Sequence, residues 1–364
     1  MKLYFTLSRY FMKNFFVWFA IFMFAILCLV ILFDFSEQMR KSASKEDVGV
    51  AQIAELVFLR LPYMAQQLTP FIVLFASIFV FWKLNRSNEI IVARASGISI
   101  WQIIFPVVAG ALIIGFIDIV VVNPVSAIMM EKYKRVNSGL FHGAKGGFTL
   151  SETGIWIRHL NINGPEVLKI DRVNEKDSSL EKIMILEYDN NNNYLGRIDA
   201  KNGKFVNNGI QLNDVIFMRL DKPVENVTTT IYPTTLTQKD FFDTNMPPEA
   251  LSFWEIPSYV KLLEKSGLSS SKYQLYWQSL VAKIVWLAAM VVLAATCSLR
   301  YTRRSGTSII IGIGVSLGFL LYFLSVITYT MGQSGTLPTV FAAWAPVIVS
   351  SFLGITALLH LEDG

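Results

Sequence analysis

Histidine, cysteine and charged residues are all scarce in this sequence. Its 364 residues include three histidines and two cysteines, and 16% are charged, against about 25% in an ordinary soluble domain. No CxxC pair and no His cluster occurs, so neither a zinc site nor a disulfide framework is indicated. The P-loop pattern that cradles nucleotide phosphates is missing, and no Ser or Cys has a base nearby in sequence. We therefore predict no metal, cofactor, catalytic site or ATPase site in this chain.

Apolar residues, by contrast, are abundant. Hydrophobic residues make up 53% of the chain, and the mean hydropathy is +0.46. A helix needs about 20 mainly apolar residues to cross ~30 Å of hydrocarbon. Six segments meet this requirement: 15–33, 64–84, 100–122, 279–299, 308–330 and 338–359. The first run is too long for a signal peptide and lacks a cleavage site, so we predict a membrane bundle of six transmembrane helices with a retained first anchor.

Basic residues in short loops indicate the orientation, because Lys and Arg close to a span resist translocation. They precede the first span and lie between the second and third and between the fourth and fifth spans: Lys2, Arg9, Lys13, Lys83, Arg86, Arg94, Arg300, Arg303 and Arg304. The loop between the fifth and sixth spans, MGQSGTL, carries no charge. The first outer loop is itself basic, so the bias is imperfect. We predict cytoplasmic termini, a bacterial inner-membrane location and a segment between the third and fourth spans that faces the periplasm or the cell exterior.

That segment differs from the spans in composition and pattern. It is polar, rich in Asn, Asp, Gly and Thr, and contains alternating runs such as GIWIRHL, EVLKIDRV and DVIFMRL. Turn residues follow or interrupt these runs at 190–193, 201–204 and 207–209. The pattern predicts an inserted all-β domain and fits a sandwich, a jelly roll or a half-barrel. A helical period returns over 251–267. The predicted division of the chain is 1–124, 125–275 and 276–364.

Two ionisable residues lie inside predicted spans, where a charge at the bilayer centre costs at least ~2.5 kcal/mol. Asp118 and Lys283 both sit toward the outer ends of their helices. They either pair across the bundle or reach the interface separately. In the fifth span, the glycines of GIGVSLG, Gly312, Gly314 and Gly318, have the wrong spacing for a dinucleotide fingerprint and predict close helix packing.

The cytoplasmic segment RSNEIIVARASG, 86–97, is predicted to contain a short helix between two spans. Ser87 and Asn88 are candidate N-caps, Glu89 stands in the first turn, and Gly97 ends the helix. Such a helix either receives force from a separate motor or is a plain connecting turn.

Several basic residues lie at the predicted outer membrane surface, where the insertion rule does not favour them. Arg40 and Lys41 follow the first span, and Lys132, Lys134 and Arg135 follow the third. They are candidates for anionic lipid headgroups, since Lys and Arg pair with phosphate oxygens. The alternative is a solvated basic collar on the outer domain.

A family resemblance rests on the order and spacing of several motifs. These are LSRYFMKNF near the amino terminus, LRLPYMAQQLTPFIVLFASI, the RSNEIIVARASGIS loop, GIWIR, LSFWEIPSYVKLLEKSG, GIGVSLGFLLYF and GQSGTLPTVFAAWAP. Over nearly its whole length the chain resembles the lipopolysaccharide export permease family, LptF and LptG, and more closely the LptG branch.

The resemblance implies one permease half of an ATP-binding cassette exporter for lipopolysaccharide, with a periplasmic β-jellyroll domain. Its partners would be an LptF-like permease, a cytoplasmic dimer of LptB-like ATPases that hydrolyses the ATP, a single-span LptC-like protein and membrane lipids, with no nucleic acid. The family's coupling helix falls on Ser87, Glu89, Arg94 and Gly97. Phosphates of the cargo would be held by Arg40, Lys41, Lys134 and Arg135. Acyl chains would contact apolar residues of the first and fifth spans, Phe24, Leu27, Ile31, Phe319 and Tyr322.

The chain departs from the family pattern at two places. Family members often carry a basic residue at the outer end of the first span, where this chain has Asp34. A proline is frequent near the start of the fourth span, where this chain reads AKIVW, and Lys283 would compensate as a basic cavity residue. Export of another amphiphile, and a non-transporting scaffold or sensor with a ligand-binding outer domain, remain alternatives.

Overall fold

The structure is a computed structural model. It describes residues 2–42, 49–141, 148–151, 154–161, 164–174, 179–189, 193–206, 209–219, 223–234, 247–265, 269–298 and 307–363. The predicted turn residues 190–192 and 207–208 and the basic loop 299–306 lie outside this description. The chain forms two compact units. The bundle unit comprises Met1–Tyr133, Glu249–Phe253 and Ser271–Gly364, and the sheet unit comprises Lys134–Pro248 and Trp254–Ser270.

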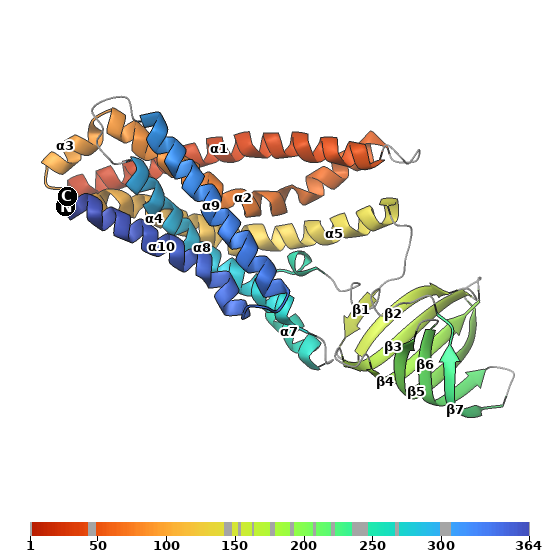
Figure 1. Cartoon of the computed structure of the whole chain (residues 1–364). Coiled ribbons are helices and arrows are strands. Elements are labelled where there is room, and N and C mark those ends of the chain that lie inside the picture. The colour runs from red at the N-terminus through yellow and green to blue at the C-terminus, as the bar shows by residue number, and fades with distance from the viewer. Residues whose placement is uncertain are drawn as a thin grey trace. The chain divides into compact units, whose positions relative to one another are not determined.

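Six long apolar helical stretches occupy the predicted spans, which confirms the membrane bundle (Figure 1). They are α1 (Lys2–Ser42), α2 (Val50–Arg86), α4 (Ile100–Ile117) continued by η1 (Asp118–Val122) and α5 (Asn123–Phe141), α8 (Ser271–Ser298), α9 (Thr307–Gln333) and α10 (Thr339–Asp363). Most extend several residues beyond the apolar runs, because polar and charged residues continue the helices past the hydrocarbon. The start of α1, the end of α10 and the short helix α3 (Glu89–Ala95) lie at the same end of the bundle unit (Figure 1).

Helix α8 is central in the bundle unit and packs against α2, α4, α9 and α10. Phe15, Phe81, Ile103 and Leu287, contributed by four different helices, are fully buried in the main apolar cluster. Within this chain, only 6% of the residues in the most apolar stretch of α1 are buried, whereas 67% are buried in that of α2. The apolar surface of α1 therefore faces lipid or another protein.

The glycines of α9 serve close helix packing, as predicted. A Cβ atom at Gly318 would clash with the side chain of Leu74 in α2, and one at Gly314 would lie 3.3 Å from Cys297 in α8. Gly312 has open space around it. Small residues at two of the three positions thus let α9 approach both α2 and α8.

The inserted all-β domain is also confirmed, and its strands form an antiparallel meander. β1 (Phe148–Ser151), β2 (Gly154–Asn161), β3 (Gly164–Asn174), β4 (Ser179–Tyr188), β5 (Tyr194–Val206), β6 (Gly209–Arg219) and β7 (Glu225–Tyr232) pair in sequence order in a seven-stranded sheet. Alternating side chains bury one face, for example Leu168 and Ile170 of β3. The chain continues through η2 (Pro248–Ala250) to α7 (Ile256–Lys265), which falls within the predicted helical period.

The turn predicted at 201–204 is wrong, because β5 runs through these residues without interruption. Gly203 lies under neighbouring side chains instead: a Cβ there would clash with Ile183 and approach Leu212 to 3.2 Å. A glycine is therefore needed at this position for close packing between strands, not for a turn. Gly209, at the start of β6, does have a positive φ of 150°, and a Cβ there would clash with the carbonyl of Tyr232.

Strand β7 reaches across the sheet to β3 and β4, although it pairs with β6. The Tyr232 hydroxyl lies 2.7 Å from Glu166 Oε2 and 3.2 Å from Glu187 Oε1. Thr234 also donates to Glu166. Burial, together with the charge of Glu166, raises the pKa of the Tyr232 phenol far above its ordinary value. The sheet is therefore strongly curled, and a neutral phenol joins its last strand, β7, to the interior strands β3 and β4.

Candidate functional site

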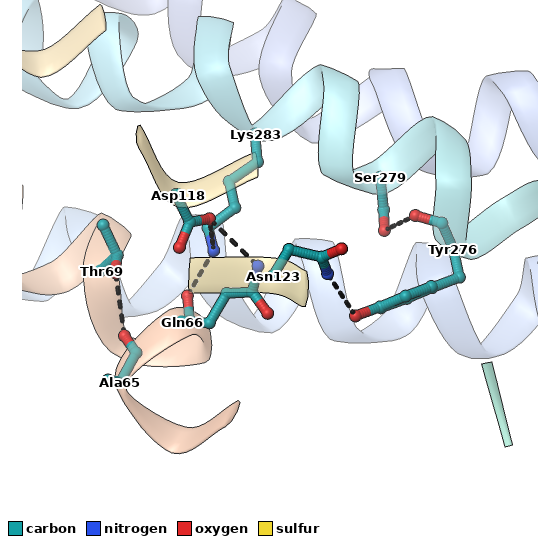
Figure 2. A network of polar contacts seen from close by, with 8 residues as sticks. All are labelled: Ala65, Gln66, Thr69, Asp118, Asn123, Tyr276, Ser279 and Lys283. Carbon is teal, nitrogen blue, oxygen red and sulfur yellow. Dashed lines mark hydrogen bonds and ion pairs between the residues drawn. The ribbon is translucent and has the colours of Figure 1, made fainter. Parts of the chain in front are cut away.

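The site begins with a proline inside α2. Pro70 has no N–H, so the carbonyl of Gln66, four residues earlier, loses its usual helical donor. Lys283 of α8 supplies the missing hydrogen bond by donating its ammonium to that carbonyl (Figure 2). A local defect in one span is thus satisfied by a charged residue from another.

Lys283 also forms an ion pair with Asp118, at 2.7 Å between Nζ and Oδ2 (Figure 2). The amide of Gln66 donates to the same carboxylate oxygen at 3.3 Å. Asp118 and Gln66 are each 3% exposed. Of the two expectations for Asp118 and Lys283, the structure shows pairing across the bundle.

Asp118 stands at the first residue of η1, a π-helical turn between α4 and α5. A π-turn holds one more residue than an α-turn, which changes the direction of the side chains that follow, and such turns are frequent at functional sites. Isolated buried charges are costly, and this pair is tolerated only because each group has further hydrogen bonds. The network therefore joins α2, η1 and α8 at one point.

A second polar network lies beside the first. Asn123 donates to the Tyr276 hydroxyl at 3.4 Å and accepts a hydrogen bond from the Phe253 N–H at 2.7 Å. The Phe253 ring stacks on Trp277 at 5.4 Å between centroids. These contacts fasten residues 249–253, which follow the sheet, to α5 and α8 within the bundle unit.

The predicted basic residues of the bundle unit differ in their partners. Lys41 pairs with Glu37 at 2.7 Å, and Lys132 pairs with Glu55 at 2.8 Å. Arg40 is exposed and has neither an ion pair nor a hydrogen bond among the described residues. Arg40 is therefore the better placed of the two α1 residues to meet an external anion.

Asp34 stands at the position where the family resemblance leads us to expect a basic residue. It is 9% exposed and accepts a hydrogen bond from Arg60 of α2 at 2.9 Å. The Arg60 guanidinium also lies 6.0 Å from the centre of the Tyr133 ring. The carboxylate is thus a structural partner of Arg60. Lys134 and Arg135 are exposed residues of α5 that belong to the sheet unit.

The predicted apolar contacts lie on α1 and α9, which both pack against α2. Phe24 is 74% exposed and Ile31 37% exposed, while Leu27 is half-buried. Phe319 and Tyr322 are exposed on α9, and their rings contact Phe71 of α2, at 5.5 and 4.9 Å between centroids.

The predicted helix over 86–97 is present as α3, which is anchored in the bundle. Ile90 and Ala93 are buried in the main apolar cluster, whereas Ile91, Val92 and Arg94 are exposed. The predicted caps act differently from expectation. Asn88 occupies the N-cap position at φ 62° without a side-chain bond to the helix.

Ser87 lies one residue before this N-cap, and its hydroxyl donates to Glu89 Oε1 at 2.8 Å. Gly97, at φ 85°, permits the left-handed turn after the helix, as expected. The buried residues of α3, the Ser87–Glu89 hydrogen bond and the turn at Gly97 therefore hold its exposed face in a defined position.

Sequence reasoning missed Gln66, Pro70 and Arg60 as site residues. A proline within a span, four residues after a glutamine, signals an unpaired carbonyl and could have drawn attention to Gln66. Arg60 gave no such signal, because its partner Asp34 belongs to another helix. Within the described residues, no group of three or more His, Cys, Asp or Glu could hold a metal ion.

The fold and this network define a polytopic α-helical membrane protein with an inserted antiparallel sheet. The sequence model described as lipopolysaccharide export system permease LptF/LptG matches residues 9–360, and the chain belongs to this family. It is 24% identical over 353 residues to the lipopolysaccharide export system permease protein LptG of Escherichia coli (strain K12), with 94% of each chain covered. It is 22% identical over 355 residues to LptG of Haemophilus influenzae, covering 94% of this chain and 95% of the relative.

Proposed function

We propose that this chain is a permease subunit of an ATP-binding cassette exporter that extracts lipopolysaccharide from the inner membrane. The observation that carries the proposal is α3, a short helix between two spans that is anchored in the bundle core. Because Ile90 and Ala93 are buried there, a push on the exposed Val92 side moves the packed helices as a rigid body. The family and the named cargo of its relatives supply the substrate.

The proposed partners follow from the surfaces that the chain leaves uncovered. An LptF-like permease covers apolar surface of α1 and α9, whose most apolar stretches are 6% and 22% buried. A dimer of LptB-like ATPases binds on the cytoplasmic side, where α3 meets it, and hydrolyses the ATP, so this chain needs no nucleotide cofactor. A single-span LptC-like protein continues the path of the β domain.

The orientation in this proposal follows from the number of spans. The inserted sheet comes after the third span, so it lies on the opposite side of the membrane from the amino terminus and α3. With α3 in the cytoplasm, both termini are cytoplasmic and the sheet is periplasmic. Lipopolysaccharide phosphates then meet Arg40, Lys41, Lys134 and Arg135, while acyl chains contact the exposed apolar residues of α1 and α9.

The test is charge reversal on α3 in the complete complex. Glu89→Lys places a cation where Ser87 now donates a hydrogen bond and where the motor docks. We expect lipopolysaccharide release per ATP hydrolysed to fall roughly tenfold, the effect of about 1.4 kcal/mol at one contact. Glu89→Gln, which keeps an oxygen acceptor for Ser87, is the matched control and should remain near wild type.

Purification of the tagged chain from its native membrane in mild detergent tests the assembly. Mass spectrometry should identify an LptF-like chain, a P-loop ATPase and lipopolysaccharide. Recovery of another lipid with the ATPase would point to export of a different amphiphile. Recovery of the folded chain without any ATPase would contradict the exporter and favour a scaffold or sensor.

A further inference from the structure

A cavity of about 390 Å³ lies inside the bundle unit, among α2, α8, α9 and α10. This volume is within the range of small-ligand sites, about 300–1,000 Å³. One carboxylate and one ammonium line it, from Glu249 of η2 and Lys283 of α8. The remaining lining is aromatic, uncharged polar or apolar, and it comes from the spans.

The cavity has an excess negative charge. The Lys283 ammonium is already engaged by the Asp118 carboxylate and the Gln66 carbonyl. Among the described residues, the Glu249 carboxylate has no ion-pair or hydrogen-bond partner. A carboxylate at the end of a membrane bundle is costly unless a cation or water reaches it. The unmatched charge therefore favours a cationic ligand.

Aromatic rings line the same cavity as this carboxylate. They belong to Tyr63, Tyr276, Tyr322, Tyr329 and Trp286. Aromatic faces attract a desolvated ammonium group and add to the attraction of a carboxylate. Two of the rings are held in place through their hydroxyls.

Those hydroxyls act as acceptors. The Tyr63 hydroxyl accepts from Gln67 at 2.6 Å, and that of Tyr276 accepts from Asn123 at 3.4 Å. Each phenol therefore retains its own proton, which can be donated to an oxygen atom next to the bound ammonium. The site offers a cation-binding end and neighbouring hydrogen-bond donors.

The apolar part of the lining indicates how a ligand arrives. Pro70, Leu280, Val326 and Val347 contribute apolar surface within the spans. A water-soluble amine has little to gain from such surface, whereas the upper part of an acyl chain or glycerol backbone does. The ligand is thus an amphiphile that enters from the lipid phase.

We propose that this cavity binds the primary ammonium head group of a membrane amphiphile, with Glu249 as its counter-ion and the tyrosines as its aromatic wall. A primary ammonium has three N–H donors that match the carboxylate oxygens, whereas a quaternary ammonium has none. The same group occurs on ethanolamine phospholipids and on amino-modified glycolipids. The site is independent of the exporter's motor and of the predicted phosphate contacts.

The experiment uses the full chain in its complex, extracted in mild detergent and stripped of lipid. Native mass spectrometry follows the binding of three lipids with identical acyl chains: dioleoyl phosphatidylethanolamine, phosphatidylglycerol and phosphatidylcholine. We expect the ethanolamine lipid to bind roughly tenfold more tightly than the other two, as one charge-assisted contact allows. Glu249→Gln should abolish this preference and leave the melting temperature unchanged.

Glu55→Gln is the matched control, because Glu55 is an acid of the bundle unit that does not line the cavity. It should preserve the preference for ethanolamine. Equal binding of all three lipids by the wild type, or an unchanged preference in Glu249→Gln, would overturn the proposal. Equal losses in both variants would assign the effect to general surface charge and would also overturn it.

A second arm separates the two sources of the ammonium group. Lipid A with and without a phosphoethanolamine group is titrated into the wild type and Glu249→Gln. A gain from the added group that depends on Glu249 identifies the glycolipid as the ligand. If only the phospholipid shows a Glu249-dependent gain, the site holds a bilayer lipid. If Glu249→Gln keeps the gain in affinity for both ammonium-bearing lipids, Glu249 binds an ammonium group from neither source, and the proposal is refuted.

Discussion

Asp118 and Lys283, 165 residues apart in sequence, form a 2.7 Å ion pair within the bundle, and the lysine also completes a hydrogen bond that Pro70 removes from α2. The pair is therefore a three-way junction between α2, η1 and α8. A buried pair of this kind is weak evidence for stability, because desolvation offsets much of the attraction. It does fix the register of the helices that it joins.

Removal of one partner should be far more damaging than removal of both. Asp118→Leu or Lys283→Met leaves an uncompensated buried charge and should destabilise the bundle by about 3–5 kcal/mol, whereas the double variant should be closer to wild type. Denaturant unfolding in detergent measures these changes. If the double variant is as unstable as the worse single variant, the pair contributes through packing rather than charge.

The role of Pro70 predicts a coupling with Lys283. In Pro70→Ala, the backbone N–H gained at this position can donate to the Gln66 carbonyl, so the lysine is no longer needed there. Lys283→Met should then cost about 1.5–3 kcal/mol less than in the wild type, the value of one hydrogen bond to a charged group. A double-mutant cycle of unfolding free energies measures this coupling.

Pro62 provides the control for that cycle. It is the other proline within α2, and it frees the carbonyl of Phe58, four residues earlier. Lys283 donates to the Gln66 carbonyl and not to that of Phe58. Pro62→Ala should therefore change stability without changing the cost of Lys283→Met. Equal coupling to both prolines would show that helix straightening, rather than the freed carbonyl, links α2 to α8.

The sequence predicts the spans well, because hydropathy and length are local properties. It also marks Asp118 and Lys283, since charges within apolar runs are conspicuous. Their pairing depends on which helices pack together, and no local pattern carries that information. Gly203 shows the reverse error: its neighbours in sequence indicate a turn, yet Ile183 from an adjacent strand determines its role. The surroundings of Asp34 and Glu249 are likewise set by distant segments.

Tyr232 should make the curled sheet sensitive to alkaline pH. Its ordinary pKa is 10.0, and burial raises the folded value, so its stabilising contribution is full below about pH 10 and is lost as pH rises further. Tyr232→Phe removes the hydroxyl bond to Glu166 and should cost about 1–3 kcal/mol at neutral pH. Hydrogen exchange of sheet peptides in the full chain measures both effects.

The exposed Tyr194 serves as the comparison for Tyr232. Tyr194→Phe should leave both the neutral and the alkaline stability of the sheet close to wild type. If Tyr232→Phe retains the loss of protection above about pH 10, another group controls that transition, and the phenol contact between β7 and the strands β3 and β4 does not account for it.

Arg40 and Lys41 should contribute unequally to the binding of an anionic glycolipid. Lys41 already pairs with Glu37, so an incoming phosphate must compete with that carboxylate. Arg40→Ala should therefore weaken binding more than Lys41→Ala, and Glu37→Gln should strengthen it by releasing the lysine. Titration of lipid A bearing two phosphates or one into the purified complex, at low and high salt, measures each effect. Phosphate contacts predict that the differences shrink at high salt and with the singly phosphorylated lipid. Equal losses of lipid A binding in Arg40→Ala and Lys41→Ala that do not depend on salt would instead indicate that both residues stabilise the end of α1. Neither residue would then contact the substrate.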